Sequence, residues 1–299
     1  MASSPLTTVA AVDIGTNSMR MLVIRRIGDG AVELGRWERV TGLGRGVDAT
    51  GEFAAEAVDR TLIALLEFGG RMRQLGVEKA RAVGTSASRD AANRDSFFDR
   101  AETALGFRPE IISGDEEARL SYAGATSRLP PDSKPVVVDI GGGSTEFVVA
   151  EGGRSIDIGS VRLTERFLPS RPAPAAEVEA ARAHCHELFS VMSVPEHDAV
   201  LGSGGTWTTL AAIHLVSDEV DGSTITKSEL DGLVDRLAGL TMQQTEALPG
   251  LVPARAAVIL GGAVVAQSSL QFLGAESMRV SVADLLDGIA AQLLAEAGR

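Results

Sequence analysis

Two segments of this 299-residue chain share a pattern that suits the binding of phosphate and metal ions. Residues 9–14 form an apolar run that carries Asp13 near its end and continues into small polar residues, and residues 136–144 repeat this pattern around Asp139. A carboxylate at a strand end can bind a metal ion or water, and the Gly, Ser, Thr and Asn residues after it can turn backbone N–H groups toward phosphate oxygens. One such turn alone usually marks only a hairpin. The copies lie 139 − 13 = 126 residues apart, about one domain length, which indicates a duplicated unit with one copy in each lobe.

Two further glycine-containing stretches differ in what they predict. Gly202–Thr206 follows a short apolar run and fits the same picture of phosphate binding. Asp157-Ile158-Gly159 repeats the Asp-Ile-Gly tripeptide, but it lacks the preceding apolar strand and the glycine-serine tail. We therefore expect Asp157 to be a solvated residue of a strand.

The acidic run at residues 115–117 offers a candidate general base. Ser113 and Glu116 have the spacing of a capping box, in which Glu116 folds back onto the Ser113 N–H at the start of a helix. Glu117 is rotated by about 100° around that helix and stays available for chemistry. A purely structural alternative is that all three acids only complement the helix dipole.

Alternating strands and helices must position these residues, as in an α/β fold. Apolar periodicity, glycines and capping patterns predict the elements. Strands are expected at 19–24, 31–40, 80–83, 110–112, 147–150, 155–161 and 199–201, and a segment at 278–282 leads into the last helix. Helices are expected at 52–76, 95–105, 175–192 and 226–237, from Pro253, and up to about residue 297.

Together these motifs resemble the exopolyphosphatase and guanosine pentaphosphate phosphohydrolase (Ppx/GppA) family of the actin-like ATPase superfamily. The resemblance extends from about Val9 to Gly288. The motifs that carry it are the two Asp-Ile-Gly hairpins, residues 84–93, residues 112–120, Gly202–Thr206 and residues 253–256. It implies an α/β fold of two actin-like (ribonuclease H-like) lobes with an interlobe cleft. The expected domains are 1–126 and 127–283, separated by the proline-containing linker 127–135, with the last helix 284–299 returning to the first lobe.

The resemblance also names Glu117 as the catalytic residue, and phosphoanhydride chemistry suggests roles for the others. Carboxylates and water are the ligands that a hard divalent cation prefers, so Mg²⁺ or another divalent cation is expected at Asp13, Asp139 and Glu146. Hydrogen-bond donors and guanidinium groups suit phosphate oxygens. The expected phosphate-binding residues are Asn17, Ser18, Arg20, Arg89, Gly142, Gly143 and Ser144.

The predicted function is hydrolysis of terminal phosphate from inorganic polyphosphate, with guanosine pentaphosphate as a second substrate. One alternative is a phosphotransferase of the same superfamily. Another is a regulatory module that binds polyphosphate or guanosine tetraphosphate and has weak catalysis. The family often carries a Gly-x-Arg-Glu-Gly stretch after its last strand, whereas residues 284–288 read Asp-Leu-Leu-Asp-Gly here. The missing arginine puts an extended polymer groove in doubt.

Composition limits the other partners. The net charge of −12 disfavours nucleic acid and acidic membranes, and the apolar runs are too short for a membrane span. A single cysteine, Cys185, fits a cytoplasmic protein, and the first residues lack the pattern of a secretory signal. His184 and His186 diverge on their predicted helix and cannot share a metal. The oligomeric state, for which a homodimer is one option, stays open.

Overall fold

The computed structural model describes residues 7–28 and 30–297. Its strands are β1 (Thr8–Ile14), β2 (Ser18–Ile27), β3 (Gly30–Val40), β4 (Lys79–Gly84), β5 (Glu110–Ile111), β6 (Pro135–Ile140), β7 (Thr145–Val149), β8 (Gly152–Ile156), β9 (Ala199–Ser203), β10 (Thr224–Thr226) and β11 (Ser277–Val280). Its helices are α1 (Val47–Thr50), α2 (Ala55–Gln74), α3 (Ser86–Asp90), α4 (Arg94–Leu105), α5 (Gly114–Thr126), α6 (Ser160–Phe167), α7 (Ala175–Ser190), α8 (Gly205–Leu215), α9 (Lys227–Ala238), α10 (Met242–Glu246), the 3₁₀ turn η1 (Pro253–Arg255), α11 (Ile259–Leu273) and α12 (Leu285–Ala297).

The chain divides into two compact units, each built on one sheet. The first unit extends to Gly124 and resumes at Leu285, and the second covers Ala125–Asp284. The first sheet has the strand order β3-β2-β1-β4-β5, and the second has the order β10-β11-β9-β6-β7-β8. The domain boundaries predicted after residues 126 and 283 stay predictions.

The two sheets repeat one arrangement of strands. In each, three antiparallel strands in sequence (β1–β2–β3 and β6–β7–β8) are joined to a parallel neighbour of the first strand, β4 or β9. The register agrees as well, because Asp13 lies opposite Arg20 and Asp139 lies opposite Glu146, and 146 − 20 equals the 126-residue offset. The duplication expected from the sequence is therefore present in the fold.

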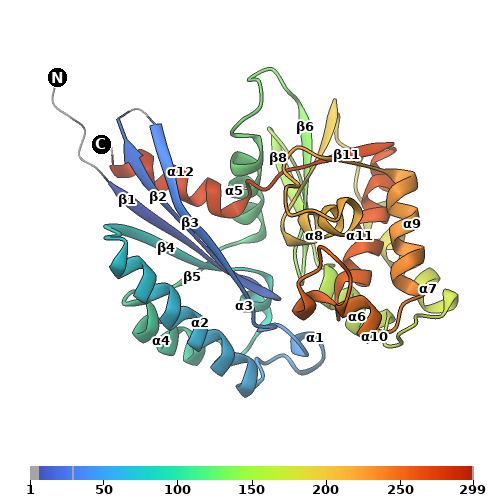
Figure 1. The fold of residues 1–299 in the computed structure, drawn as a ribbon, viewed down its shortest axis with the longest axis horizontal. Coiled ribbons are helices and arrows are strands. Elements are labelled where there is room, and N and C mark those ends of the chain that lie inside the picture. The colour runs from blue at the N-terminus through green and yellow to red at the C-terminus, as the bar shows by residue number, and fades with distance from the viewer. Residues whose placement is uncertain (1–6, 29, 298–299) are drawn as a thin grey trace. The chain divides into compact units, whose positions relative to one another are not determined.

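Apolar helices cover both faces of the first sheet. On one face, Val12, Met19 and Met21 pack with α2 and α4. On the other, Val9, Ala11 and their neighbours pack with Leu286 and Ile289 of α12, and Figure 1 shows the two helical layers on opposite sides of β1–β4. The last helix thus completes the core of the first unit.

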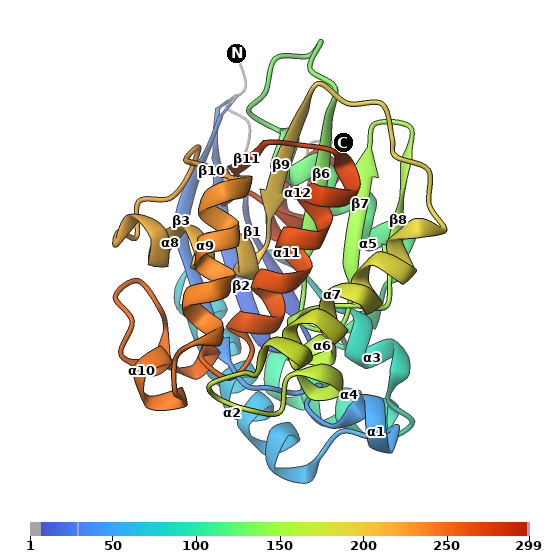
Figure 2. The ribbon, with the colours of Figure 1, turned by 90° about the vertical axis from the view of Figure 1, so that its right-hand side faces the viewer.

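One face of the second sheet is covered by a helical layer. Val136, Val138 and Ile140 of β6 alternate onto this face and pack in a single core with residues of α7, α8, α9 and α11. Figure 2 shows α6, α7, α9 and α11 in front of β6 and β9. The alternate residues of β6, among them Asp139, lie on the opposite face.

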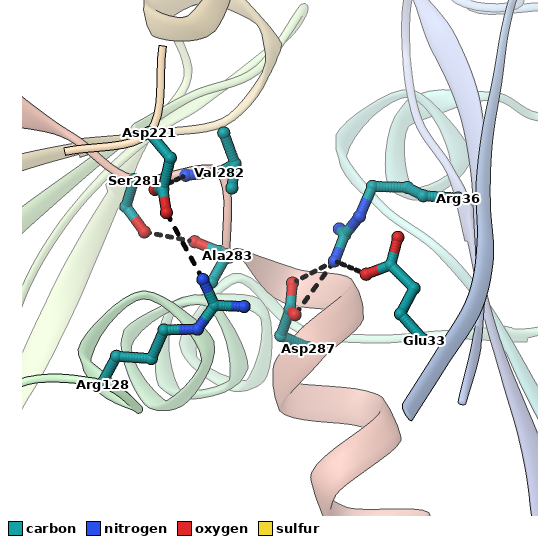
Figure 3. A network of polar contacts seen from close by, with 8 residues as sticks. All are labelled: Glu33, Arg36, Arg128, Asp221, Ser281, Val282, Ala283 and Asp287. Carbon is teal, nitrogen blue, oxygen red and sulfur yellow. Dashed lines mark hydrogen bonds and ion pairs between the residues drawn. The ribbon is translucent and has the colours of Figure 1, made fainter. Parts of the chain in front are cut away.

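Side-chain contacts hold the chain on both sides of Asp284, and Figure 3 shows them. In the first, Arg36 of β3 donates to both carboxylate oxygens of Asp287 in α12, at 3.0 and 3.1 Å. In the second, the Asp221 carboxylate accepts from Arg128 at 3.3 Å and from the Val282 N–H at 3.1 Å. These contacts tie down the chain on either side of Asp284, where it leaves the second unit.

The structure corrects the strand expected at 155–161 and confirms the helix expected at 226–237. Residues 155–161 do not form one strand, because β8 ends at Ile156 and α6 begins at Ser160. Leu286, at the position where the resemblance expects arginine, is fully buried in an apolar cluster. The doubt about an extended polymer groove stays a prediction. The capping box at Thr226 and Glu229 is present in both directions, with bonds of 3.2 and 2.8 Å.

A matched pair of glycine substitutions tests the docking of α12. An added Cβ at Gly288 would lie 2.1 Å from the Leu120 carbonyl oxygen of α5, whereas one at Gly232 of α9 would meet nothing within 4 Å. We expect Gly288→Ala to lower the free energy of unfolding by about 1–3 kcal/mol through overpacking. Gly232→Ala should raise it by about 0.5–1 kcal/mol, the usual gain for Gly to Ala in a helix. Urea unfolding followed by circular dichroism measures both, and equal shifts for the two variants would contradict the close approach of α12 and α5.

Candidate functional site

The loop between β1 and β2 is held by its own backbone and by a neighbouring segment. The Gly15 N–H donates to the Ser18 carbonyl at 3.1 Å. The N–H groups of Thr41 and Gly42 both donate to the Asn17 carbonyl, at 3.0 and 2.9 Å. The Asn17 side chain is buried, and its Oδ1 has no hydrogen-bond partner among the described residues. Buried polar atoms of this kind call for an explanation, and a ligand is one of the recognised ones.

Asp13 and Arg20 form a pair across β1 and β2. Arg20 donates from Nε and Nη2 to one oxygen of Asp13, Oδ2, at 3.1 and 2.7 Å. The Asp13 side chain is almost fully buried and that of Arg20 is 18% exposed. The contact offsets the cost of burying the Asp13 carboxylate and fixes the direction of the guanidinium.

A second pair joins the two residues that the sequence singled out for catalysis and phosphate binding. Arg89 lies in α3, directly after β4, and its Nη1 donates to Glu117 Oε2 at 2.8 Å and to the Ile112 carbonyl at 3.2 Å. The Glu117 side chain is 12% exposed. Sequence reasoning selected these two residues for different reasons, and the fold places them in direct contact.

The adjacent Glu116 has a different environment. Its N–H donates to Ser113 Oγ at 3.2 Å, so this half of the capping box is confirmed. Its carboxylate does not serve as the second half, because Oε1 pairs with Arg81 Nη2 at 2.5 Å. Glu116 and Glu117 therefore point to different partners, as their rotation around the helix requires.

The loop between β6 and β7 repeats the first hairpin and is held by the start of α6. The Gly141 N–H donates to the Ser144 carbonyl at 3.0 Å, the counterpart of the bond between Gly15 and Ser18. The N–H groups of Val161 and Arg162 donate to the Gly142 carbonyl at 2.8 and 3.2 Å. Gly143 and Ser144 are buried.

Gly159 has a role that the sequence did not reveal. A Cβ added to it would lie 2.6 Å from the carbonyl carbon and oxygen of Gly142, so only glycine allows this approach. Asp157 is exposed, as expected, but it follows β8 instead of lying within it. The tripeptide at 157–159 thus supports the loop between β6 and β7.

A row of polar side chains crosses the second sheet. Ser203 of β9, Asp139 of β6, Glu146 of β7 and Ser155 of β8 are successive partners in the strand register, so their side chains lie on one face. Ser155 Oγ donates to Glu146 Oε1 at 2.7 Å. Asp139 is 8% exposed and Glu146 is 1% exposed. A Cβ added at Gly204 would lie 2.4 Å from Asp139 Oδ1, which shows that this carboxylate leans toward the end of β9.

The donor set of this row fits a hard divalent cation. Two neighbouring buried carboxylates on one face repel each other unless a positive charge lies near them. No group of three or more His, Cys, Asp or Glu side chains that could hold a metal ion occurs in the part of the chain that the structure describes. Asp139 and Glu146 would therefore need water or substrate oxygens to complete the coordination, which is common for Mg²⁺.

The predicted site residues thus form two groups, one in each unit. The first holds Asp13 with Arg20, Glu117 with Arg89, and the loop of Asn17 and Ser18. The second holds Asp139, Glu146 and the loop Gly142–Ser144. Sequence reasoning missed Arg81, Ser155 and Gly159, and it placed Ser203 in a phosphate-binding stretch without linking it to the carboxylates. The signal for Ser155 and Ser203 is their register with Glu146 and Asp139, which only strand pairing supplies.

Duplicated mixed sheets, each with a buried carboxylate in its first strand and a loop of small residues after that strand, define a two-lobed, actin-like fold. The chain belongs to the Ppx/GppA phosphatase family, which matches residues 23–297. Both the predicted family and the predicted α/β fold of two actin-like lobes are confirmed.

Individual relatives agree with this assignment. The chain is 42% identical to exopolyphosphatase 2 of Mycobacterium tuberculosis, over 96% of this chain and 99% of the relative. It is 29% identical to the guanosine-5'-triphosphate,3'-diphosphate pyrophosphatase of Photobacterium profundum, over 99% of this chain and 61% of the relative. A crystal structure of an exopolyphosphatase-like protein is similar with a TM-score of 0.90 at 35% identity, over 97% of this chain and 99% of that one. Within the described residues, no helix is both long and apolar enough to span a membrane.

The contact between Glu116 and Arg81 predicts that Glu116 acts in stability and not in turnover. Glu116→Gln should lower the free energy of unfolding by about 0.2–1 kcal/mol, the range for a partly exposed ion pair. The loss should shrink in high salt, because salt screens such pairs. Urea unfolding at low and high ionic strength measures the effect, and loss of turnover with unchanged stability would be the contrary result.

Proposed function

We propose that this protein is an exopolyphosphatase that hydrolyses the terminal phosphate of inorganic polyphosphate and also accepts guanosine pentaphosphate. The observation that carries the proposal is the contact of Glu117 with Arg89, at 2.8 Å. A nearly buried carboxylate held by a guanidinium combines a proton acceptor with a group that binds phosphoryl oxygens. The names of the M. tuberculosis and P. profundum relatives support the two substrates.

In the proposed reaction, the Glu117 carboxylate orients a water molecule and accepts its proton. The water oxygen forms a bond to the terminal phosphorus as the bond from that phosphorus to the bridging oxygen breaks. The products are inorganic phosphate and a polyphosphate shorter by one unit. Arg89 holds Glu117 in place before the substrate binds, and its remaining N–H groups are directed at the oxygens of the terminal phosphate.

The two hairpin loops bind the phosphate chain in this scheme. Backbone N–H groups and side chains of Asn17, Ser18 and Gly142–Ser144 donate to phosphate oxygens. Arg20 adds a positive charge whose direction is fixed by Asp13. This interaction favours an orienting role for Asp13, and its predicted role as a metal ligand stays a prediction. Such local cations are needed because the chain as a whole carries a net charge of −12.

Asp139 and Glu146 hold the divalent cation in the proposed site. Members of the Ppx/GppA family generally use divalent cations. The bound cation would neutralise charge on the phosphate oxygens. Ser155 fixes the Glu146 carboxylate by its hydrogen bond, so the ligand does not have to be ordered when the cation binds. The single buried cysteine fits a reducing compartment, and we place the enzyme in the cytoplasm.

A substrate panel tests the reaction class. We expect Mg²⁺-dependent release of inorganic phosphate from short and long polyphosphates and from guanosine pentaphosphate, with little release from ATP. A colorimetric phosphate assay measures the rates, and a chelator should abolish them. Transfer of phosphate from ATP to a small acceptor would favour a phosphotransferase, and tight binding of guanosine tetraphosphate without turnover would favour a regulatory module.

Two neighbouring substitutions test the catalytic base. Glu117→Gln should lower kcat for polyphosphate by roughly 10²–10⁴-fold, the usual contribution of general base catalysis. Polyphosphate binding should persist or tighten, because a negative charge facing a polyanion is removed. Glu116→Gln, one residue earlier on the same helix, is the matched control and should retain most of kcat. The assignment fails if Glu116→Gln abolishes turnover and Glu117→Gln remains active.

A further inference from the structure

The hydroxyl group of Ser203 is buried in a setting that a structural role does not explain. Ser203 ends β9 and has 0% exposure. Its Oγ has no hydrogen-bond partner among the described residues. Leaving a buried hydroxyl without a partner costs about 1–3 kcal/mol. Valine or alanine at this position would avoid that cost.

The position of Ser203 points to the carboxylates beside it. Ser203 is the register partner of Asp139, which is the partner of Glu146, so the three side chains lie on the same face of neighbouring strands. Adjacent strands lie about 4.8 Å apart, within the reach of one ion. Asp139 also leans toward the β9 end, because its Oδ1 lies against Gly204, the residue after Ser203.

The duplicated sheet supplies an internal comparison. In the first unit, the residue next to Asp13 on the parallel strand is Val83, which packs in an apolar cluster. There the partner on the other side is Arg20, whose positive charge is built into the protein. In the second unit, Glu146 stands at the position equivalent to Arg20, and Ser203 stands at the position equivalent to Val83. The additional oxygen donors thus occur in the copy that has Glu146 in place of arginine.

We propose that Ser203 is an oxygen ligand of the divalent cation held by Asp139 and Glu146. This inference rests on the proposed function in one respect, the presence of a divalent cation at Asp139 and Glu146. A hydroxyl oxygen suits a hard cation, and the row then offers three protein oxygen donors from three adjacent strands. The cation supplies the partner that the buried hydroxyl otherwise lacks.

Titration of the whole protein with Mn²⁺, followed by the electron paramagnetic resonance signal of free Mn²⁺, tests the proposal without turnover. The part of the Mn²⁺ binding that is lost in the Asp139→Asn variant is taken as binding at this site. We expect Ser203→Ala to raise the Kd of this site for Mn²⁺ by about tenfold or more, the range for lost support of a metal site. The melting temperature without metal should not fall, because the variant removes an unsatisfied hydroxyl.

Ser88→Ala is the matched control. Ser88 is equally buried and its Oγ also has no partner among the described residues, but it lies against Gly84 in the first unit. It should leave the Kd for Mn²⁺ unchanged. Equal Kd values for the unchanged protein, Ser88→Ala and Ser203→Ala would overturn the inference while leaving Asp139 and Glu146 as ligands. Absence of any Mn²⁺ binding that depends on Asp139 would overturn the cation role in the proposed function and this inference with it.

A second variant separates ligation from an indirect effect on folding. Ser203→Cys should bind Mn²⁺ as weakly as Ser203→Ala, because thiolate is a poor ligand for a hard cation. It should bind Cd²⁺ at least about tenfold more tightly than the unchanged protein does, since thiolate prefers soft cations. The native cysteine does not interfere, because burial raises the pKa of Cys185 to about 12 and it is present in every variant. Equal Cd²⁺ affinity in Ser203→Cys and Ser203→Ala would contradict direct ligation.

Discussion

Burial of a carboxylate near the end of the first strand of each sheet is the constraint on which this structure depends. Asp13 and Asp139 are 5% and 8% exposed, and a buried charge is unfavourable unless a partner compensates it. The first unit supplies that partner from its own chain, as Arg20 on the neighbouring strand. The second unit places Glu146 at the equivalent position, which adds a negative charge instead of removing one. The same fold therefore pairs the carboxylate with an arginine across the strands in one copy and with a second carboxylate in the other. In our proposal that second pair holds the divalent cation.

This difference suggests how a duplicated unit acquired two roles. Both hairpins keep the backbone bond that closes the loop, from the Gly15 N–H to the Ser18 carbonyl and from the Gly141 N–H to the Ser144 carbonyl. The two units differ in the register partner of the buried aspartate, which is Arg20 in the first unit and Glu146 in the second. In our proposal the first unit contributes guanidinium groups and the catalytic base, and the second contributes the metal ligands.

Helix α5, which carries the proposed catalytic base Glu117, is held from several directions. Ser113 caps α5, Arg81 pairs with Glu116, and Arg89 pairs with Glu117, so two successive carboxylates have separate and fixed partners. Farther along the helix, the Leu120 carbonyl lies so close to Gly288 of α12 that a methyl group would not fit. The C-terminal helix therefore supports the position of Glu117, although it is about 170 residues away in the sequence. This contact gives a physical reason for glycine at position 288 of this chain.

The sequence by itself determined the class of the fold, the duplication and the family. Apolar periodicity, the repeat of one motif after 126 residues, and the motifs themselves can all be read along the chain without knowing which strands pair. It also placed α2, α4, α7 and α9 close to their bounds, whereas the helix expected from Pro253 begins at Ile259 and α8 was not predicted. It misjudged residues 155–161, since Ile156 and Ile158 alternate as in a strand although β8 ends at Ile156 and α6 begins at Ser160. Only the tertiary structure decided that Arg20 faces Asp13, that Arg89 faces Glu117, and that Ser203 and Ser155 flank the two carboxylates. These arrangements depend on tertiary packing and on the register of paired strands, which no single segment encodes and which sets the side chains that share a face.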